Sequence, residues 1–362
     1  MLPLNALRWV VGTGLIYAEW QVYTTPLLRR STPLAVVWYL FCAALSSPFL
    51  LLWAPLEAAT VGYLHWAGIF GPVQQVPNGI PRNGAMPTGA LRSSSGRSPS
   101  PARARRHSPT TGQLRVVSYN IQSGVGSDMR CDLPRVARSL RRMGPLDLVA
   151  LQEIDITEGE DQVAEIARLA GFAHHAFVGT RPSELGKGEY GDAILSKLPI
   201  EETHVHWFRQ WWLRAQRACL FVRVQPPGSG SVWFGSGHLQ HDITSYENSE
   251  QFVELRDAIA ALPGAAAATT AVGLDANMLG IRMANAAHSA GLVEHCGAAH
   301  PSTFPAIRPL YRLDGLLSSA CDGVELEVSS ADMRLSAEGS ADPETGEQVS
   351  DHMPVLGTLL LH

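Results

Sequence analysis

Polar residues that could bind a cation or a phosphate follow six apolar runs of this chain of 362 residues. The runs before them, such as residues 115–119 and 148–151, are rich in β-compatible residues, so each polar side chain is expected at the rim of a sheet, where loops carry function. Carboxylate and amide oxygens gathered there could share a hard cation. The six segments are SYNIQSG with Asn120, ALQEID with Glu153, SGHLQH with His238, GLDANML with Asp275 and Asn277, YRLDGLL with Asp314, and SDHMPV with Asp351 and His352.

Each of these residues alone has an ordinary structural explanation. An Asp or Asn after a strand is most often a turn residue or a helix cap. In the same way, His238 could be a satisfied core histidine and Asp314 a surface carboxylate. These explanations do not account for all six segments occurring together. The set therefore indicates one convergent site, although no single member does.

The order and local sequence of the motifs resemble the endonuclease/exonuclease/phosphatase superfamily, from about residue 114 to residue 362. This superfamily includes pancreatic-type deoxyribonuclease, abasic-site endonucleases, neutral sphingomyelinases and inositol-polyphosphate phosphatases. Further agreement comes from GDAILSKLPI at Gly191, the Arg217-Ala-Cys-Leu run and STFPAIRP before Asp314. The resemblance implies an α/β four-layer sandwich of two mixed β-sheets flanked by helices. The first hundred residues have no part in it.

The resemblance also implies a metal site and a phosphate contact. Asn120 and Glu153 correspond to residues that hold a divalent metal, usually magnesium and alternatively manganese, with Asp351 close by. Arg217 occupies the position at which family members contact a phosphate.

Catalytic roles are implied for the remaining residues, listed here with their counterparts in the family. His238 matches the histidine that ends a strand before the helical connection, Asp275 and Asn277 match the Asp-x-Asn pair facing the scissile phosphorus, and Asp314 matches the acid that hydrogen-bonds the final histidine, His352. Two positions depart from the family pattern. Leu274 stands where Gly is common, and Asp192 stands where Asn or a small residue is common, which adds negative charge near the site.

These residue types suit hydrolysis of a phosphodiester, which is anionic and repels hydroxide. A hard cation would neutralise charge, and a positioned water would attack in line with the leaving oxygen. A histidine oriented by a carboxylate, as His352 would be by Asp314, keeps one tautomer and gains basicity. Asp275 is the candidate for orienting the water, and Asn277 for donating to a phosphoryl oxygen. How acid and base duties divide among Asp275, His238 and His352 stays open.

Charge is distributed unevenly along the chain. Residues 1–112 hold nine Arg against two Glu, a net charge of +7, whereas the remainder holds 19 Lys and Arg against 31 Asp and Glu, a net charge of −12. Proteins that grip long nucleic acids usually carry a basic face, so the acidic part argues against tight DNA binding. A local exception is a cluster that could contact phosphates, lipid headgroups or bases, or could pack only for structure: Arg209, Arg214, Arg217, Trp207, Trp211 and Trp212.

The five cysteines are widely spaced and show no C-x-x-C pattern. We therefore expect buried free thiols rather than a zinc site or a disulfide framework.

The N-terminal region predicts a membrane anchor. No charge interrupts residues 31–56, a length that spans a hydrocarbon core of roughly 30 Å as a helix. Residues 58–81 form a weaker second span, and one or two spans would place the enzyme on opposite sides of the membrane. The alternative is a cleaved organelle-targeting segment, since the region is rich in Arg and poor in acids. The predicted domains are therefore an apolar region at 1–77, a disordered basic linker at 78–112 and a catalytic domain at 113–362.

Three helices and a hairpin can be placed within the catalytic domain. Asp132 is expected to cap a helix that ends before Gly144, and a second helix covers 163–170 and stops at Gly171. Thr244 and Glu247 form a capping-box pattern before a third helix. Strands at 216–224 and 231–236 flank a Pro-Pro-Gly-Ser turn and are expected to pair.

The sequence thus predicts a membrane-tethered, Mg2+-dependent phosphoesterase that cleaves a phosphodiester in a nucleic acid or a phospholipid headgroup. The alternative is a catalytically silent membrane protein that uses the same fold to bind a partner or a lipid. No protein partner is evident from the sequence.

Overall fold

The computed structural model describes residues 91–94, 112–183, 187–210, 215–241, 246–297, 300–319 and 325–361. The predicted membrane spans and most of the predicted linker lie outside these ranges, as does Thr244 of the predicted capping box. Among the helices that the structure describes, none is both long and apolar enough to cross a bilayer. The anchor and the domain boundaries therefore stay predictions.

The first sheet is mixed and has seven strands in the order β1-β4-β5-β3-β2-β13-β12. The β2 and β3 strands run parallel, and the other neighbours are antiparallel. The strands are β1 (Leu91–Ser94), β2 (Gln113–Asn120), β3 (Leu148–Thr157), β4 (His174–Pro182), β5 (Gly188–Ser196), β12 (Glu325–Glu327) and β13 (Val355–Leu360).

The second sheet is also mixed and has six strands in the order β10-β11-β9-β8-β7-β6. Here β8 and β9 are the parallel pair. The expected hairpin is confirmed, because β7 and β8 pair antiparallel from Cys219↔Gly237 to Val224↔Val232. The strands are β6 (Ile200–Trp207), β7 (Ala218–Val224), β8 (Val232–His238), β9 (Thr269–Asp275), β10 (Leu292–Glu294) and β11 (Asp314–Ser319).

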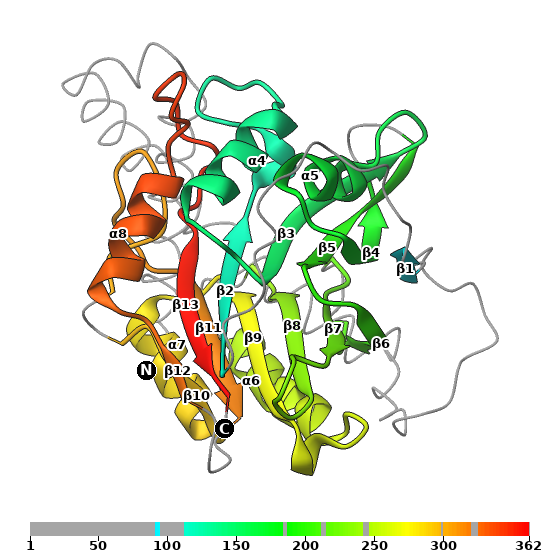
Figure 1. Cartoon of the computed structure of the whole chain (residues 1–362). Coiled ribbons are helices and arrows are strands. Elements are labelled where there is room, and N and C mark those ends of the chain that lie inside the picture. The colour runs from blue at the N-terminus through cyan, green and yellow to red at the C-terminus, as the bar shows by residue number, and fades with distance from the viewer. Residues whose placement is uncertain are drawn as a thin grey trace, which may run out of the picture. The chain divides into compact units, whose positions relative to one another are not determined.

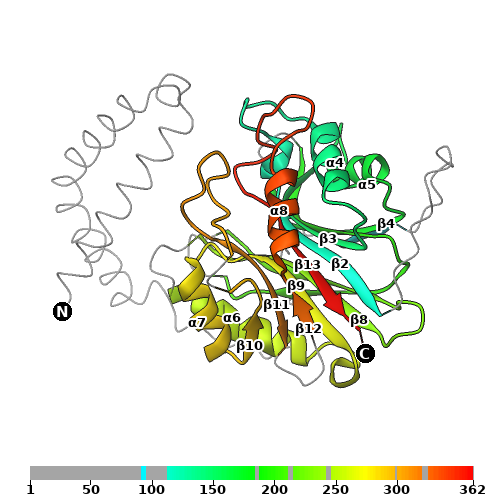
Figure 2. The same ribbon diagram turned by 60° about the vertical axis from the view of Figure 1, so that its left-hand side comes forward.

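Helices cover the outer faces of both sheets, which gives four layers (Figure 1). Figure 2 shows α4, α5 and α8 beside the first sheet and α6 and α7 beside the second. Three buried apolar clusters fill the spaces between the layers: one under α4 and α5, one between the sheets, and one under α6 and α7. The helices are α4 (Leu133–Arg142), α5 (Gln162–Ala170), α6 (Tyr246–Ala260), α7 (Gly280–Ser289) and α8 (Ser330–Gly339), with short 3-10 turns η1 (Gln122–Gly124) and η2 (Ala265–Ala267). The predicted sandwich of two mixed sheets is confirmed.

The helix ends follow the local sequence signals. The Asp132 side chain accepts a hydrogen bond from the backbone N–H of Arg135, which caps α4 as predicted. Gly171 ends α5 in the left-handed conformation, with φ of 77°, which a residue without a Cβ adopts at little cost.

Two ion pairs hold α4 and α8 against the rest of the domain. Arg138 of α4 donates from Nε and Nη2 to the two carboxylate oxygens of Asp342, at 2.8 and 2.9 Å. Arg115 of β2 donates to Asp332 of α8 at 2.6 Å. The Asp342 side chain is fully buried, and the hydrogen bonds from Arg138 lower its pKa to about 2. We refer to this region as the α4–α8 face.

The two sheets pack tightly beneath the end of β9. A Cβ added to Gly273 would lie 2.7 Å from the Cβ of Ala150 in β3 and 2.9 Å from the Cβ of Ser118 in β2. These distances are shorter than van der Waals contact, so only glycine fits there without movement of the opposite sheet.

Candidate active site

The predicted catalytic residues gather at one end of the two sheets because the strand pairing brings their positions together. Asn120 ends β2, and His238 and Asp275 end the parallel strands β8 and β9 in register with each other. Asp314 begins β11 directly opposite Asp275. Asp351 and His352 precede β13, which pairs with β2 from Val355↔Ser118 onward.

Asp275 lies at the centre of this group. Its Oδ2 accepts a hydrogen bond from Asn120 Nδ2 at 2.9 Å and lies 3.5 Å from His238 Nε2 and 3.9 Å from His352 Nε2. Its Oδ1 accepts the backbone N–H of Asn277 at 2.9 Å. The carboxylate is thus fixed by neutral donors while two histidine rings face it.

A distortion of β3 directs Glu153 toward the site. The pairing of β3 with β5 shifts between Leu151 and Ile154, and Glu153 has a φ of 59°, which is unusual for a residue with a side chain. A β-bulge of this kind turns a side chain out of the regular alternation. Glu153 Oε1 consequently accepts a hydrogen bond from Asn120 Nδ2 at 3.0 Å.

Negative charge is crowded around these residues. Burial and then the Asp351 carboxylate raise the pKa of Glu153. Burial also raises the pKa of Asp351, with a further contribution from Asp275. Burial and the neighbouring Asp314 raise the pKa of Asp275. A bound cation would relieve this repulsion, because opposite charge favours ionised carboxylates.

The oxygen donors fit a hard divalent cation. Glu153 and Asp351 provide carboxylates, and Asn120 provides an amide oxygen that accepts the backbone N–H of Gln122 at 3.1 Å but retains a second lone pair. A different trio, Asp275, Asp314 and His352, places one possible ligand atom each within 4.8 Å of the others. In that trio Asp314 already pairs with His352, so we favour the Glu153 and Asp351 carboxylates.

The structure pairs His352 with Asp314 as the resemblance implied. His352 Nδ1 lies 2.9 Å from Asp314 Oδ2, and the Phe304 ring packs against the imidazole with ring centroids 4.9 Å apart. Burial alone would lower the pKa of His352, but the carboxylates of Asp314 and Asp275 outweigh it and raise the pKa well above its usual value. The two carboxylates therefore favour the protonated ring.

The pKa of His238 is shifted in the opposite direction to that of His352. Its Nε2 lies 2.9 Å from Asn277 Nδ2, and its buried Nδ1 has no hydrogen-bond partner among the described residues. Burial and the positive charge of Arg217 lower the pKa of His238 well below its usual value. These surroundings favour the neutral ring, and its Nδ1 is left for a ligand or a water.

Arg217 lies just before β7, beside the unusual Asp192 of β5. The Arg217 charge lowers the pKa of Asp192, but burial raises it more, so the net pKa is well above the usual range. Arg217 Nε has no hydrogen-bond partner in the described part of the chain. Of the predicted basic and aromatic cluster, Trp207 is partly exposed, whereas Trp211, Trp212 and Arg214 lie outside the described residues.

Sequence reasoning missed a layer of polar residues directly beneath the site. Gln152 Nε2 donates to Ser236 Oγ at 3.2 Å and lies 3.4 Å from Ser118 Oγ, so it connects the two sheets. Ser118 and Ser236 stand two positions before Asn120 and His238, and side chains two apart on a strand share a face. That spacing could have identified both serines.

Two further supporting residues gave no signal in the sequence. Asn248 of α6 donates to the carbonyls of Gln240 and Ala276, at 2.5 and 2.7 Å, and thereby fixes the backbone that follows His238 and Asp275. Thr303 Oγ1 accepts the backbone N–H of Asp314 at 3.3 Å. An Asn within a helix or a Thr within a loop is usually solvated, so neither stands out.

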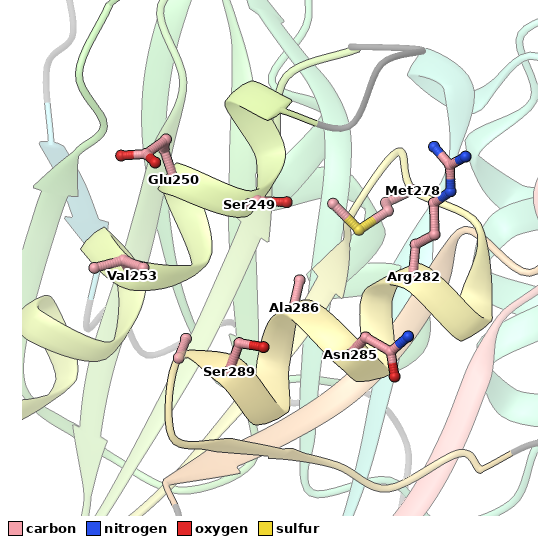
Figure 3. Close-up of a pocket in the computed structure, with 9 residues that line it drawn as sticks. Ser249, Glu250, Val253, Met278, Arg282, Asn285, Ala286 and Ser289 are labelled. Atoms are coloured by element: carbon pink, nitrogen blue, oxygen red, sulfur yellow. The ribbon is translucent and has the colours of Figure 1, made fainter. Parts of the chain in front are cut away.

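A separate groove lies outside the second sheet, between α6 and α7 (Figure 3). It is lined by Ser249, Glu250, Val253, Met278, Arg282, Asn285, Ala286, Ser289 and Ala290. None of the predicted catalytic or metal-binding residues lines it. We therefore do not assign the chemistry to this groove.

Comparison with known proteins agrees with the geometry. The family model described as the Endonuclease/Exonuclease/phosphatase family matches residues 117–320. None of the curated proteins matches the chain.

Among solved structures, an endonuclease/exonuclease/phosphatase from Beutenbergia cavernae DSM 12333 is 22% identical, with a TM-score of 0.54 over 69% of this chain and 72% of that chain. A family protein from Bacteroides thetaiotaomicron is 18% identical, with a TM-score of 0.52 over 69% and 98%. The mannosyl-6-phosphatase of Bacteroides thetaiotaomicron VPI-5482 is also 18% identical, with a TM-score of 0.52 over 69% and 99%. At these identities the structures establish the fold.

The family match covers more than half of the chain, and its residues include the segments from Asn120 to Asp314 that meet at the end of the two sheets. The chain therefore belongs to the Endonuclease/Exonuclease/phosphatase family and is a metal-dependent phosphoester hydrolase.

Proposed function

We propose that this protein is a membrane-tethered, Mg2+-dependent phosphodiesterase acting on a nucleic acid or a phospholipid headgroup by in-line attack of water. The observation that carries the proposal is the environment of Asp275, which accepts a hydrogen bond from Asn120 and faces two histidines, one of them paired with Asp314. This arrangement provides a base, a cation and a phosphate ligand within one buried group. The predicted apolar region at 1–77 motivates the tether.

Glu153 and Asp351, with the amide oxygen of Asn120, would hold the cation. When bound, Mg2+ or Mn2+ would neutralise charge on the phosphoryl oxygens. The other steps belong to the chain itself. Asp275, held by Asn120, accepts a hydrogen bond from the attacking water and thereby orients the lone pair of that water toward the phosphorus.

The two histidines and Arg217 would stabilise the charge that develops on the phosphoryl group. His352 is cationic because of Asp314, so it can bind a non-bridging oxygen or donate a proton to the leaving oxygen. His238 is neutral and directs a free Nδ1 away from Asn277, which suits a hydrogen bond to a phosphoryl oxygen. Arg217 would add a fixed positive charge at the rim.

The test is hydrolysis by the full chain in detergent micelles, with Mg2+, Mn2+ or EDTA. Substrates are bis(p-nitrophenyl) phosphate, plasmid, an abasic oligonucleotide, sphingomyelin and inositol phosphates. The informative variant is Asp275→Asn, and the matched control is Asp257→Asn, an exposed carboxylate on α6. Metal-dependent turnover that is lost only in Asp275→Asn supports the proposal and identifies the substrate class.

The second candidate is a catalytically silent protein that binds a partner or a lipid with the same fold. It is disfavoured because every predicted catalytic position is occupied by a competent residue. It would replace the first proposal if no substrate in the panel were turned over with any metal while binding to one of them persisted in Asp275→Asn.

A further inference from the structure

Two segments beside the active site expose aliphatic side chains: a loop after β9 that runs into the first turn of α7, and the loop before β11. We define the apolar rim as Leu279, Ile281, Ile307 and Leu310, which are 43, 76, 45 and 50% exposed. Aliphatic residues exposed together and bordered by polar ones often mark an interaction surface. Single exposed aliphatic residues are common, so only neighbouring ones indicate an interaction surface.

The two loops are joined to each other. They continue the neighbouring strands β9 and β11, which pair at Asp275↔Asp314. Beyond that pair, the backbone N–H of Ala276 donates to the carbonyl of Leu313 at 2.9 Å, and Arg312 Nη2 lies 3.4 Å from the carbonyl oxygen of Gly280. The two segments that carry the four rim residues are therefore neighbours in the fold.

That surface adjoins the catalytic residues. Leu279 lies two residues after Asn277. On the other loop, the backbone N–H of Ala306 donates to the carbonyl of Asp351 at 2.7 Å, and Ile307 and Leu310 follow. A partner that carries phosphate groups and binds the rim would thus hold those phosphates close to the catalytic residues.

The two segments themselves contain no exposed acidic residue although the domain is acidic, and the nearby exposed acid Glu250 of α6 lines the groove that also includes Arg282. Between Asp275 and Asp314 the sequence contains a single acid, Glu294, whereas residues 113–362 contain 31. Glu294 is buried and paired with Arg312 at 2.7 Å. Arg282 and Arg308 are exposed beside Ile281 and Ile307. Exposed arginine beside exposed aliphatic side chains complements an anionic lipid surface, where the apolar groups enter the acyl boundary and the charges meet headgroups.

We propose that the apolar rim docks the catalytic domain on an anionic phospholipid bilayer, so that the active site meets a headgroup phosphodiester at the membrane surface. This inference rests on the proposed function and selects the lipid headgroup over the nucleic acid as its substrate class. Stacking on bases requires exposed aromatic side chains, and the rim residues are all aliphatic. Tethering at residues 1–77 would raise the local concentration of the rim at the bilayer.

The experiment uses hydrogen–deuterium exchange of the full chain, because a tether would hold any variant on vesicles and mask bulk binding. Exchange is followed with vesicles of phosphatidylcholine alone or mixed with phosphatidylglycerol. We expect residues 277–284 and 305–312 to exchange more slowly with the anionic vesicles, and the turn at 225–231 to stay unchanged.

The variant that tests the rim is Ile281→Asp combined with Leu310→Asp, and the control is Val253→Asp, whose residue is similarly exposed at 39% on α6. We expect the double variant to lose the protection, since burying one aliphatic side chain changes affinity by about tenfold or more. Turnover of vesicle phospholipid should fall by a similar factor, while turnover of bis(p-nitrophenyl) phosphate should not change. The control should keep both the protection and the turnover.

Each other outcome overturns a defined statement. Protection that is absent, that persists in the double variant, or that single-stranded DNA produces instead of vesicles overturns the docking inference. If the rim is protected but no phosphoester is hydrolysed, the docking surface stands and the proposed function fails. If bis(p-nitrophenyl) phosphate is hydrolysed but the rim is unprotected, only the docking inference fails.

Discussion

Buried carboxylates occur in two regions of this protein, and their pKa values move in opposite directions. In the active site, burial and like charge raise the pKa of Glu153, Asp275 and Asp351. On the α4–α8 face, the side chain of Asp342 is also closed to solvent, but its pKa is lowered to about 2 because Arg138 donates two hydrogen bonds to it.

Burial contributes most to the raised pKa values in the site, whereas the hydrogen bonds from Arg138 contribute most to the lowered pKa of Asp342. On the α4–α8 face the fold provides a fixed cation for the carboxylate. In the active site the fold places several carboxylates around amide donors and one charge-paired histidine, so negative charge exceeds positive charge. A metal ion and a substrate bind where such an imbalance exists, at a cost in stability that other regions must offset.

The largest expected effect comes from Asp275→Asn. Turnover of any active substrate should fall by about a thousandfold or more, since the residue that orients water is lost. The free energy of unfolding in EDTA should stay unchanged or increase, because a neutral amide relieves the repulsion with Asp314. Steady-state kinetics and urea unfolding measure the two effects. A variant that keeps its activity, or that loses activity only because it unfolds, would contradict the role of Asp275 in turnover.

The next effect concerns the cation of the site. His352→Asn should lower turnover by about a hundredfold to a thousandfold, and Asp314→Asn should do nearly the same, because the two residues act as one unit. The double variant should therefore be little worse than either single variant. Additive losses in kcat would show that Asp314 has a role that does not pass through His352.

On the α4–α8 face we expect a stability effect without a catalytic one. Arg138→Met should lower the free energy of unfolding by about 3 kcal/mol, because it leaves the Asp342 carboxylate buried without its cation. The matched control is Arg168→Met, which removes a similar two-armed pair with Glu165 on the surface of α5 and should leave the free energy of unfolding nearly unchanged. Urea unfolding at neutral pH measures both, and equal losses would contradict the role of burial.

The pH dependence of stability should differ in sign between the regions. Because the pKa of Asp342 is depressed, its contribution of about 2 kcal/mol is present above the unfolded pKa near 3.8 and disappears as pH falls toward 2. The difference between wild type and Arg138→Met should shrink over that interval. Because the pKa values of the site carboxylates are raised, in EDTA they should stabilise the fold as pH falls from 7, and Asp275→Asn should flatten this trend.

The smallest expected effect is stabilisation by metal. Excess Mg2+ should raise the free energy of unfolding by about 1 to 3 kcal/mol through binding to the folded state. Glu153→Gln should reduce that increment, whereas Arg138→Met should retain it. Thermal unfolding with Mg2+ or EDTA provides the measurement. A full increment in Glu153→Gln would place the cation on other residues.

Much of the fold could be predicted because its signals are local. Asp132 and Gly171 mark helix ends through their own backbone and side-chain bonds, and the hairpin at 216–236 follows from two β-rich runs around a turn. The clustering of the site was also predictable in large part, since Asn120, His238 and Asp275 end strands and Asp314 begins one, whereas Glu153 lies inside β3 rather than at its end. The pairing of His352 with Asp314 required the family resemblance, because 38 residues separate them in sequence.

The rest could not be predicted because it depends on contacts between distant segments. The positive φ of Glu153 arises from a shift in pairing with β5, and a single sequence does not show such a shift. Arg138 and Asp342 lie 204 residues apart, so nothing local connects them. The protonation states of His238 and His352 differ only because of the charges that the fold places beside each ring.

Gly273 helps to set the distance between the two sheets that carry the active site. The proposed metal-binding residues belong to or precede strands of one sheet, and most of the proposed catalytic residues belong to the other, so the spacing between the two sets follows the spacing between the sheets. Just below the site, a Cβ added to Gly273 would lie closer than van der Waals contact to Ser118 and Ala150, so the sheets approach each other this closely only because residue 273 has no side chain. One added methyl group would act as a wedge and open the gap that the Asn120 amide spans to reach Asp275. The separation of the reacting groups is thus set by steric contact, which neither salt nor pH can change.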